Sequence, residues 1–111
     1  MNKKSFLKDN EARAIRDLKE LLSRKFDLIE FRLFGSKVRG ESDFESDIDV
    51  MIELAETNPD IESQIDDIVC EINLKNDSFI STIIFSKKEL EEGPMTESPI
   101  YKIIQKEGIP L

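Results

Sequence analysis

The sequence contains no histidine or tryptophan, one cysteine, and only four glycines and four prolines in 111 residues. The single cysteine, Cys70, excludes an internal disulfide. No apolar run approaches the roughly 20 residues that a membrane-spanning helix needs, and the first residues do not resemble a signal peptide. With 39% hydrophobic and 36% charged residues, the composition is typical of a soluble globular protein. We therefore expect a cytoplasmic location and no membrane segment.

The length and charge narrow the classes of function. A chain of 111 residues corresponds to one ordinary domain, so we predict a single domain over residues 1–111. This length leaves no room for a second, substrate-recognition domain. Acidic residues outnumber basic ones by 24 to 16, and the net charge of -8 would repel a phosphate backbone. The charge therefore argues against long nucleic acid as a partner.

Apolar periodicity predicts alternating helices and strands in the first half of the chain. Between Asp9 and Phe26 the apolar residues recur every three or four positions, as on one face of an amphipathic helix. Residues 29–33 alternate between apolar and charged, which predicts a strand that ends at Gly35. Residues 47–52 alternate again and predict a second strand with an apolar and an acidic face.

In the second half of the chain, predicted helices and strands again follow one another. Asn58 is a typical helix N-cap and precedes a proline, so a helix is expected over residues 59–74. The β-branched and aromatic run over residues 79–85 predicts a third strand. A short helical turn over residues 87–92 is expected to follow.

The chain closes with one more predicted helix. Ser98 and Pro99 are typical of a helix start, and Gly108 is expected to end this helix. Residues 109–111 are interpreted as a short tail. Together, these elements predict an α/β fold.

The segment from Gly35 to Gly40 has features of a phosphate-binding turn. It begins as a strand ends, and glycine permits a positive φ or the close approach of a ligand to the backbone. Residues 37–39 are expected to form a first helical turn. Its exposed N–H groups, the Ser36 hydroxyl and the Arg39 guanidinium would bind triphosphate oxygens. A Gly-Ser pair by itself is weak evidence, because most such pairs are plain turns.

Two carboxylates follow at a spacing typical of a metal site. Asp47 and Asp49 are two apart on a predicted strand and so project from the same face of the sheet. Two neighbouring like charges repel unless a cation lies between them. Mg²⁺ commonly binds one or two carboxylates and completes its shell with water and phosphate oxygens. The pair is interpreted as a nucleotide-metal clamp.

The acidic residues between positions 41 and 49 also have simpler interpretations. Asp47 and Asp49 could be a solvated strand end, and the acids within residues 41–46 are interpreted as a solubilising loop. An EF-hand beginning at Asp43 is rejected, because Ile48 occupies the glycine position and Leu54 occupies that of the final glutamate.

The combined pattern resembles a known family. Gly35-Ser36, ten intervening residues and Asp47-Ile48-Asp49, with Arg39-Gly40 between them, resemble the signature of minimal nucleotidyltransferases in the DNA polymerase β-like superfamily. Residues 79–84 and 98–109 are also similar to later segments of these proteins. The resemblance covers most of the chain.

This resemblance implies a small α/β fold with a mixed sheet flanked by helices. It also implies ATP or another nucleoside triphosphate as donor and Mg²⁺ as cofactor, two ions being expected. Carried over by position, Asp47 and Asp49 are metal ligands and catalytic residues. Gly35 and Ser36 bind phosphate, and Arg39 offsets charge nearby. Metal ions would stabilise the attacking and leaving oxygens of nucleotidyl transfer together.

The sequence departs from the family in one respect. Active members usually carry a third carboxylate on a neighbouring strand, whereas residues 79–85 contain no acid. Asp77 precedes this strand, and Glu53 shares the alternation of Asp47 and Asp49, but neither stands where the family has its third acid. Both are expected to be exposed charges.

Three hypotheses about function can be drawn from this pattern. The leading hypothesis is a nucleotidyltransferase that moves AMP to a hydroxyl on a partner protein. In this family the partner is commonly a small helical HEPN-domain toxin encoded nearby, with the nucleotidyltransferase as antitoxin. The alternative is a nucleotide- and Mg²⁺-binding module that neutralises its partner by contact alone. In the third hypothesis the motif is coincidental. The sequence does not indicate which nucleotide is preferred. It also does not indicate whether the chain forms a homo- or hetero-oligomer.

Overall fold

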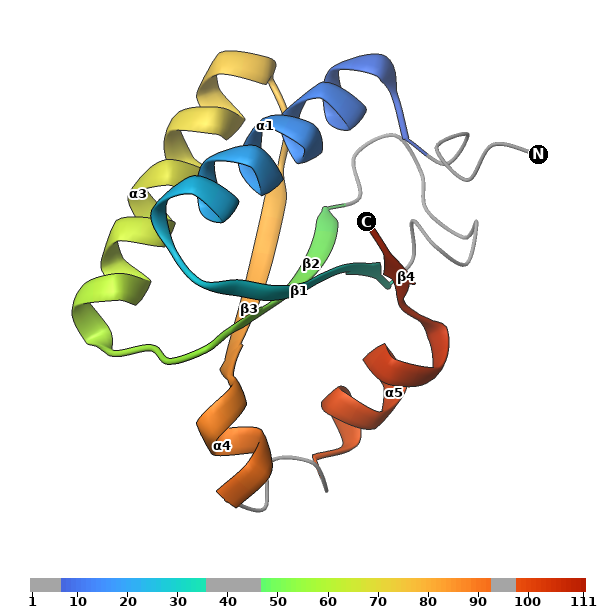
Figure 1. Ribbon diagram of the computed structural model, residues 1–111. Coiled ribbons are helices and arrows are strands. Elements are labelled where there is room, and N and C mark those ends of the chain that lie inside the picture. Colours follow the sequence, from blue (N-terminus) through green and yellow to red (C-terminus); the bar gives the residue numbers. More distant parts are fainter. Residues whose placement is uncertain (1–6, 36–46, 93–97) are drawn as a thin grey trace.

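The fold is a four-stranded sheet between two helical layers (Figure 1). The computed structural model describes residues 7–35, 47–92 and 98–111. The elements, in chain order, are α1 (Asp9–Lys25), β1 (Leu28–Phe34), β2 (Ile48–Leu54), α3 (Pro59–Asn76), β3 (Ile80–Ser86), α4 (Lys87–Glu92), α5 (Pro99–Glu107) and β4 (Ile109–Pro110). The predicted α/β class is confirmed.

The sheet is mixed, with the strand order β3-β2-β1-β4. β2 is antiparallel to β1 and parallel to β3. β4 was predicted only as a tail, but it pairs antiparallel with β1 through Arg32↔Pro110 and Leu33↔Ile109. Two residues are too few to show an alternating pattern, so only the contact with β1 makes this segment a strand.

Local capping explains where the longer helices begin and end. The side chain of Asn58 accepts a hydrogen bond of 2.8 Å from Ile61 N–H, as its predicted N-cap role requires. α3 continues two residues past its predicted end, and Asp77 follows it in the left-handed conformation. Ser98 precedes α5 as predicted, but its side chain makes no capping hydrogen bond. In the described part of the chain, no helix is both long and apolar enough to cross a bilayer.

The main hydrophobic core lies between α1, α3 and one face of the sheet (Figure 1). The apolar stripe that predicted α1 is buried there, because it faces the sheet. The buried residues of this core are Ala14, Ile15, Leu18, Leu22, Phe31, Leu33, Ile48, Val50, Ile52, Leu54, Ile65, Val69, Ile72 and Ile80.

A smaller core lies on the opposite face of the sheet. Its buried residues are Met51, Phe85, Leu90 and Ile104, contributed by β2, β3, α4 and α5. The sequence predicted an acidic face for the second strand, opposite its apolar face. This prediction is wrong for the middle and end of β2, because Met51 is fully buried there and Glu53 is only 8% exposed. Both faces of β2 therefore contribute to cores.

Candidate functional site

Asp47 and Asp49 lie at the beginning of β2 and face away from the main core. Ile48 and Val50 alternate with them and are fully buried against the α1 and α3 side. Asp47 is exposed and Asp49 is half-buried, with its backbone in the centre of the sheet. The strand geometry thus puts both carboxylates on one face, near the surface.

Gly35 lies directly against Asp49. Antiparallel pairing sets Phe34 opposite Asp49, and Gly35 then leaves the strand with a φ of 84°. A Cβ atom at position 35 would overlap with Asp49 Oδ2 and would lie 3.2 Å from Asp49 Cγ. Position 35 therefore requires glycine for two reasons: its φ is positive, and the Asp49 carboxylate leaves no room for a side chain. Ser36, Arg39 and the helical turn expected over residues 37–39 lie outside the described residues.

β3 carries Ser81 next to Asp49. The parallel register pairs these two residues, and Ser81 is exposed. Ile48 N–H donates a hydrogen bond of 2.8 Å to the Phe79 carbonyl, which aligns the beginnings of the two strands. A carboxylate at position 81 would lie beside Asp49, but the side chain there is a hydroxyl.

Asn73 determines how β3 begins, and nothing in the sequence singled it out. Its Oδ1 accepts hydrogen bonds from Ile80 N–H at 2.9 Å and from Ser78 Oγ at 3.0 Å. Its Nδ2 donates to the Ile80 carbonyl at 3.2 Å. These bonds connect the end of α3 to the first residue of β3, and so they position Ser81 indirectly. An asparagine within a helical run carries no signal of such a long-range role.

The two other acids considered as a third carboxylate differ in their surroundings. Asp77 is exposed, as predicted. The expectation of an exposed Glu53 is wrong, since α4 and α5 cover that face of β2. Burial raises the pKa of Glu53 above its ordinary value of 4.5, and Glu30, its partner on β1, raises the pKa further. Glu53 lies four strand positions beyond Asp49, about 13 Å away at the usual rise, so it does not complete the site.

The donor set at the site suits a hydrated magnesium ion. Within residues 7–35, 47–92 and 98–111, no group of three or more potential ligand side chains comes together. Asp47 and Asp49 thus provide two hard carboxylates on one face. Mg²⁺ typically keeps several water ligands and binds one or two carboxylates together with substrate phosphates. The two aspartates fit this requirement without a third protein ligand.

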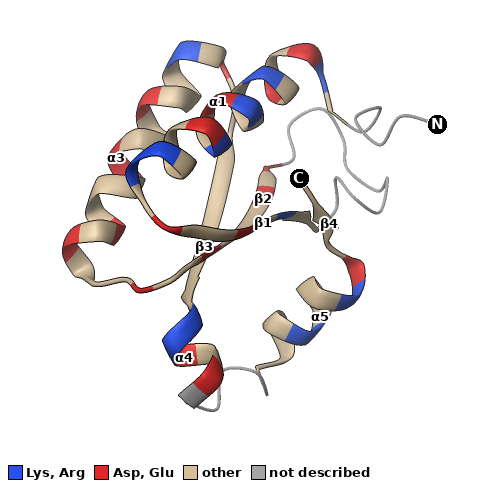
Figure 2. Cartoon of the chain, in the orientation of Figure 1, with Lys and Arg blue, Asp and Glu red and all other residues tan. Residues whose placement is uncertain are grey.

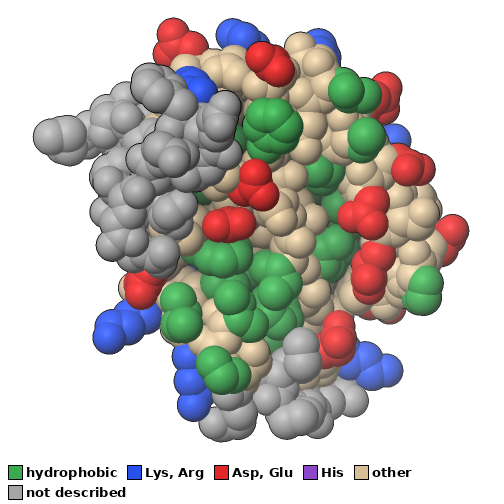
Figure 3. Space-filling model, turned by 180° about the vertical axis from the view of Figure 1, so that it is seen from behind, with side chains coloured by type: hydrophobic (Ala, Val, Ile, Leu, Met, Phe, Trp, Pro, Cys, Tyr) green, Lys and Arg blue, Asp and Glu red, His purple; other side chains and the backbone are tan. Residues whose placement is uncertain are grey.

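The surface beside the site is apolar and acidic. Figure 3 shows hydrophobic side chains gathered in the middle of the back face, with acidic side chains next to them. The small core reaches the surface through the partly buried Phe34, Ile83 and Tyr101. The Tyr101 ring meets Phe85 edge to face, with 5.4 Å between the ring centroids. A substrate at the carboxylates would therefore also meet apolar surface.

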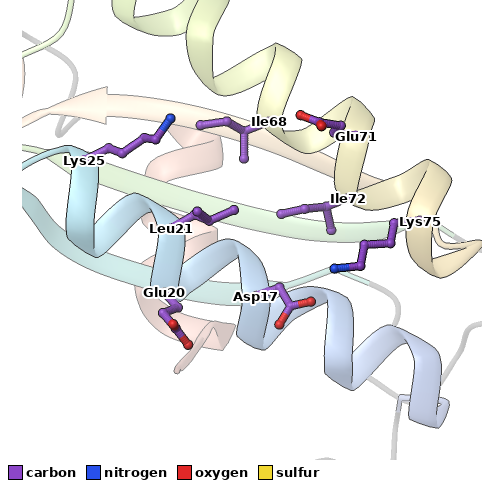
Figure 4. A pocket seen from close by; sticks show the side chains of 8 residues that line it. All are labelled: Asp17, Glu20, Leu21, Lys25, Ile68, Glu71, Ile72 and Lys75. Atoms are coloured by element: carbon purple, nitrogen blue, oxygen red, sulfur yellow. The ribbon is translucent and has the colours of Figure 1, made fainter.

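A groove of about 470 Å³ lies elsewhere, between α1 and α3 (Figure 4). Leu21, Ile68 and Ile72 form its apolar part, while acids and lysines of both helices surround them. The groove is on the helical layer that covers the main core, whereas Asp47 and Asp49 project from the other face of the sheet. It is therefore separate from the carboxylate site.

Comparisons with known proteins agree with this geometry. The sequence profile of the nucleotidyltransferase domain matches residues 15–110. The fold is similar to the crystal structure of a protein from Sulfolobus solfataricus described as a candidate nucleotidyltransferase. The TM-score is 0.54 and the identity 19%, over 92% of this chain and 82% of that one. No curated protein matches the sequence.

The buried Glu53 predicts a pH-dependent stability. Because its folded pKa lies above the ordinary value of 4.5, folding becomes less favourable as the pH rises through the folded pKa. The substitution Glu53→Gln is expected to raise Tm at about pH 7.5, because burial in the folded state disfavours the charged form of the wild-type carboxyl. Each kcal/mol corresponds to roughly 4 °C in Tm for a domain of this size, which thermal melting resolves.

This increase in Tm should shrink as the pH falls through the folded pKa and should vanish below 4.5, where the wild-type carboxyl is protonated in both the folded and the unfolded state. Glu56→Gln, at an exposed position just after β2, is the matched control and should leave the pH profile unchanged. A Glu53→Gln protein whose Tm follows the wild type at every pH would contradict the assignment.

Proposed function

The chain belongs to the nucleotidyltransferase domain family, and on this basis we propose that it transfers AMP from ATP to a hydroxyl group on a partner protein. The observation that carries the proposal is the contact between the Gly35 backbone and the Asp49 carboxylate. It brings Gly35, where the proposed phosphate turn begins, to Asp49, one of the two proposed metal ligands, although 13 residues separate these positions in the sequence.

Each part of the motif has a role in this reaction. Asp47 and Asp49 would hold two Mg²⁺ ions, which supply charge neutralisation at the triphosphate when bound. Gly35 and Ser36 would bind phosphate oxygens, and Arg39 would offset negative charge. The acceptor oxygen forms a bond to the α-phosphorus, and the bond from that phosphorus to the bridging oxygen breaks. Pyrophosphate leaves, and the acceptor proton passes to solvent.

The acceptor is proposed to be a small helical HEPN-domain protein encoded nearby, which this chain would inactivate as an antitoxin in the cytoplasm. The negative net charge supports a protein acceptor over a long nucleic acid.

One structural observation supports the alternative, a module that binds nucleotide and Mg²⁺ and neutralises its partner by contact. Ser81 occupies the β3 position beside Asp49, where a carboxylate could activate the acceptor hydroxyl. Without such a base, binding would persist while transfer is slow. An acidic surface would also suit a basic partner face.

Transfer is tested directly with ATP labelled at the α-phosphate. In the presence of Mg²⁺, label is expected to appear on the helical partner, and intact mass should show the addition of AMP. Replacing both Asp47 and Asp49 by alanine should abolish the transfer, because no carboxylate remains to hold the metal ions.

The double variant Asp66→Ala/Asp67→Ala is the matched control, since it removes two neighbouring exposed acids from α3. It should transfer AMP at the wild-type rate. Undiminished transfer by the Asp47 and Asp49 double variant would refute the site, and ATP binding without any transfer would favour the binding module.

Gly35→Ala tests the contact between the turn and the carboxylate. The added Cβ atom should displace the Asp49 side chain, and the positive φ should cost about 1–2 kcal/mol. We expect affinity for ATP with Mg²⁺ to fall about tenfold or more by calorimetry, which corresponds to ~1.4 kcal/mol.

Gly108→Ala is the control for a general loss of stability, because its Cβ atom would overlap with the Ile104 carbonyl at the end of α5. It should lower Tm and leave nucleotide affinity unchanged. Equal nucleotide affinities of the Gly35→Ala and wild-type proteins would show that the turn does not position Asp49.

Ser81→Asp separates catalysis from binding. An aspartate at this exposed position would lie beside Asp49, where it could serve as a general base. We expect the transfer rate to rise by about 100-fold, the usual scale of general-base catalysis, with ATP affinity little changed. Ser81→Asn is the uncharged control of the same shape, and an equal rate in both variants would argue against a base position at residue 81.

A further inference from the structure

β3 forms an open edge of the sheet. It is the terminal strand in the order β3-β2-β1-β4, and within the described residues no strand lies beyond it. Figure 1 shows it passing behind β1 and β2. It is seven residues long and pairs with β2 in continuous register, without a bulge. A long and regular edge strand is a template for pairing with another strand.

β3 also lacks the features that usually prevent such pairing. Its sequence, ISTIIFS, contains no charged residue and no proline. In Figure 2 its ribbon is tan over the whole length, without the red or blue of charged residues. The opposite edge differs, because β4 has only two residues and one of them is Pro110. Short strands and proline are common protections of sheet edges, and within the described residues the part of β3 beyond Ile80 has neither.

The direction of the backbone groups can be derived from the hydrogen bonds at the beginning of β3. The Phe79 carbonyl accepts from Ile48, so it points toward β2. The amide and carbonyl of Ile80 instead bond to the Asn73 side chain, away from β2. Because these groups alternate along a strand, those of Thr82 and Ile84 also point to the open side.

Charges at the two ends of β3 are opposite in sign. The exposed Asp77 precedes the strand, and Lys87 and Lys88 follow it at the beginning of α4. Figure 2 shows this as a red segment before β3 and a blue segment after it. In an antiparallel pair of two β3 strands, the acidic end of each strand lies near the basic end of the other. Glu89 and Glu91 follow these lysines on α4, and Lys87 pairs with Glu91 at 4.0 Å. The contact of opposite charges between the copies is therefore that of Asp77 with Lys88.

We propose that two copies of this chain associate through β3, in antiparallel register, to form one continuous eight-stranded sheet. The pairing centres on Ile83, with Thr82 of each copy opposite Ile84 of the other. This arrangement uses the outward amides and carbonyls of both residues, and each Asp77 comes near Lys88 of the second copy. A twofold axis perpendicular to the sheet relates the copies, so both Asp47 and Asp49 pairs face the same side.

Sedimentation velocity on the full chain tests the association. The experiment covers about a hundredfold range of concentration at about 0.15 M salt, where the screening length is about 8 Å and repulsion between two acidic copies is weakened. The wild type is expected to shift from monomer to dimer as the concentration rises. A monomer at every concentration would overturn the proposal.

Thr82→Pro locates the interface. It removes one outward-facing N–H, and proline is tolerated at such a position on an edge strand. Thr82→Ala is the control that keeps the N–H group. We expect dimerisation at least tenfold weaker in the proline variant than in the alanine variant. Equal dimerisation of the two variants would exclude β3 as the contact.

Two further measurements keep the test valid if Thr82→Pro disturbs folding. Lys88→Glu should weaken the dimer more than Lys106→Glu, which makes the same charge change at an exposed position on α5. On the unmodified chain, hydrogen exchange at the Thr82 and Ile84 amides should slow as concentration increases. Equal effects of the two lysine variants, or exchange independent of concentration, would contradict pairing through β3.

Discussion

The register of β2 between its two neighbours is the constraint on which the candidate site depends. Antiparallel pairing with β1 brings Gly35 to Asp49, and parallel pairing with β3 brings Ser81 to the same residue. A slip by one residue would turn the two aspartates into the main core and Ile48 and Val50 out of it. The fully buried side chains of Ile48 and Val50 oppose that slip, because exposing them would cost about 1.5–3 kcal/mol each. Hydrophobic burial on one face thus maintains the geometry of the polar face.

The face that carries the carboxylates is only partly a functional surface. Its beginning is near the surface at Asp47 and Asp49, while its end at Met51 and Glu53 lies under α4 and α5. One strand therefore passes from a polar site into a small core within seven residues. Glu53 has a raised pKa for this reason, since burial disfavours its charged form. The charged form of Glu53 therefore lowers the stability of the fold, and Glu53 lies on the strand that also carries the candidate metal ligands.

The carboxylate site and the open edge use different groups of the same sheet. The site lies at the beginning of β2, in the interior of the strand order, and uses side chains on one face. The edge uses backbone groups of β3 that point sideways, out of the sheet. Asn73 connects the two, because its side chain bonds to Ile80 and so determines where β3 begins beside β2. Nucleotide chemistry and self-association can therefore be altered by different substitutions.

Local sequence patterns were enough to predict most helices and strands and a nucleotidyltransferase. Periodicity located the longer helices and three strands within a few residues, and Asn58 marked the beginning of α3 through its cap. The spacing of Gly35 and the two aspartates indicated a nucleotidyltransferase, and the profile match shows that domain family. Three features could not be predicted in this way: Ser81 lies beside Asp49, Glu53 is buried, and residues 109–110 form a strand. The physical reason is that capping and periodicity depend on neighbours within a few positions, whereas burial and strand pairing depend on segments that meet only after folding.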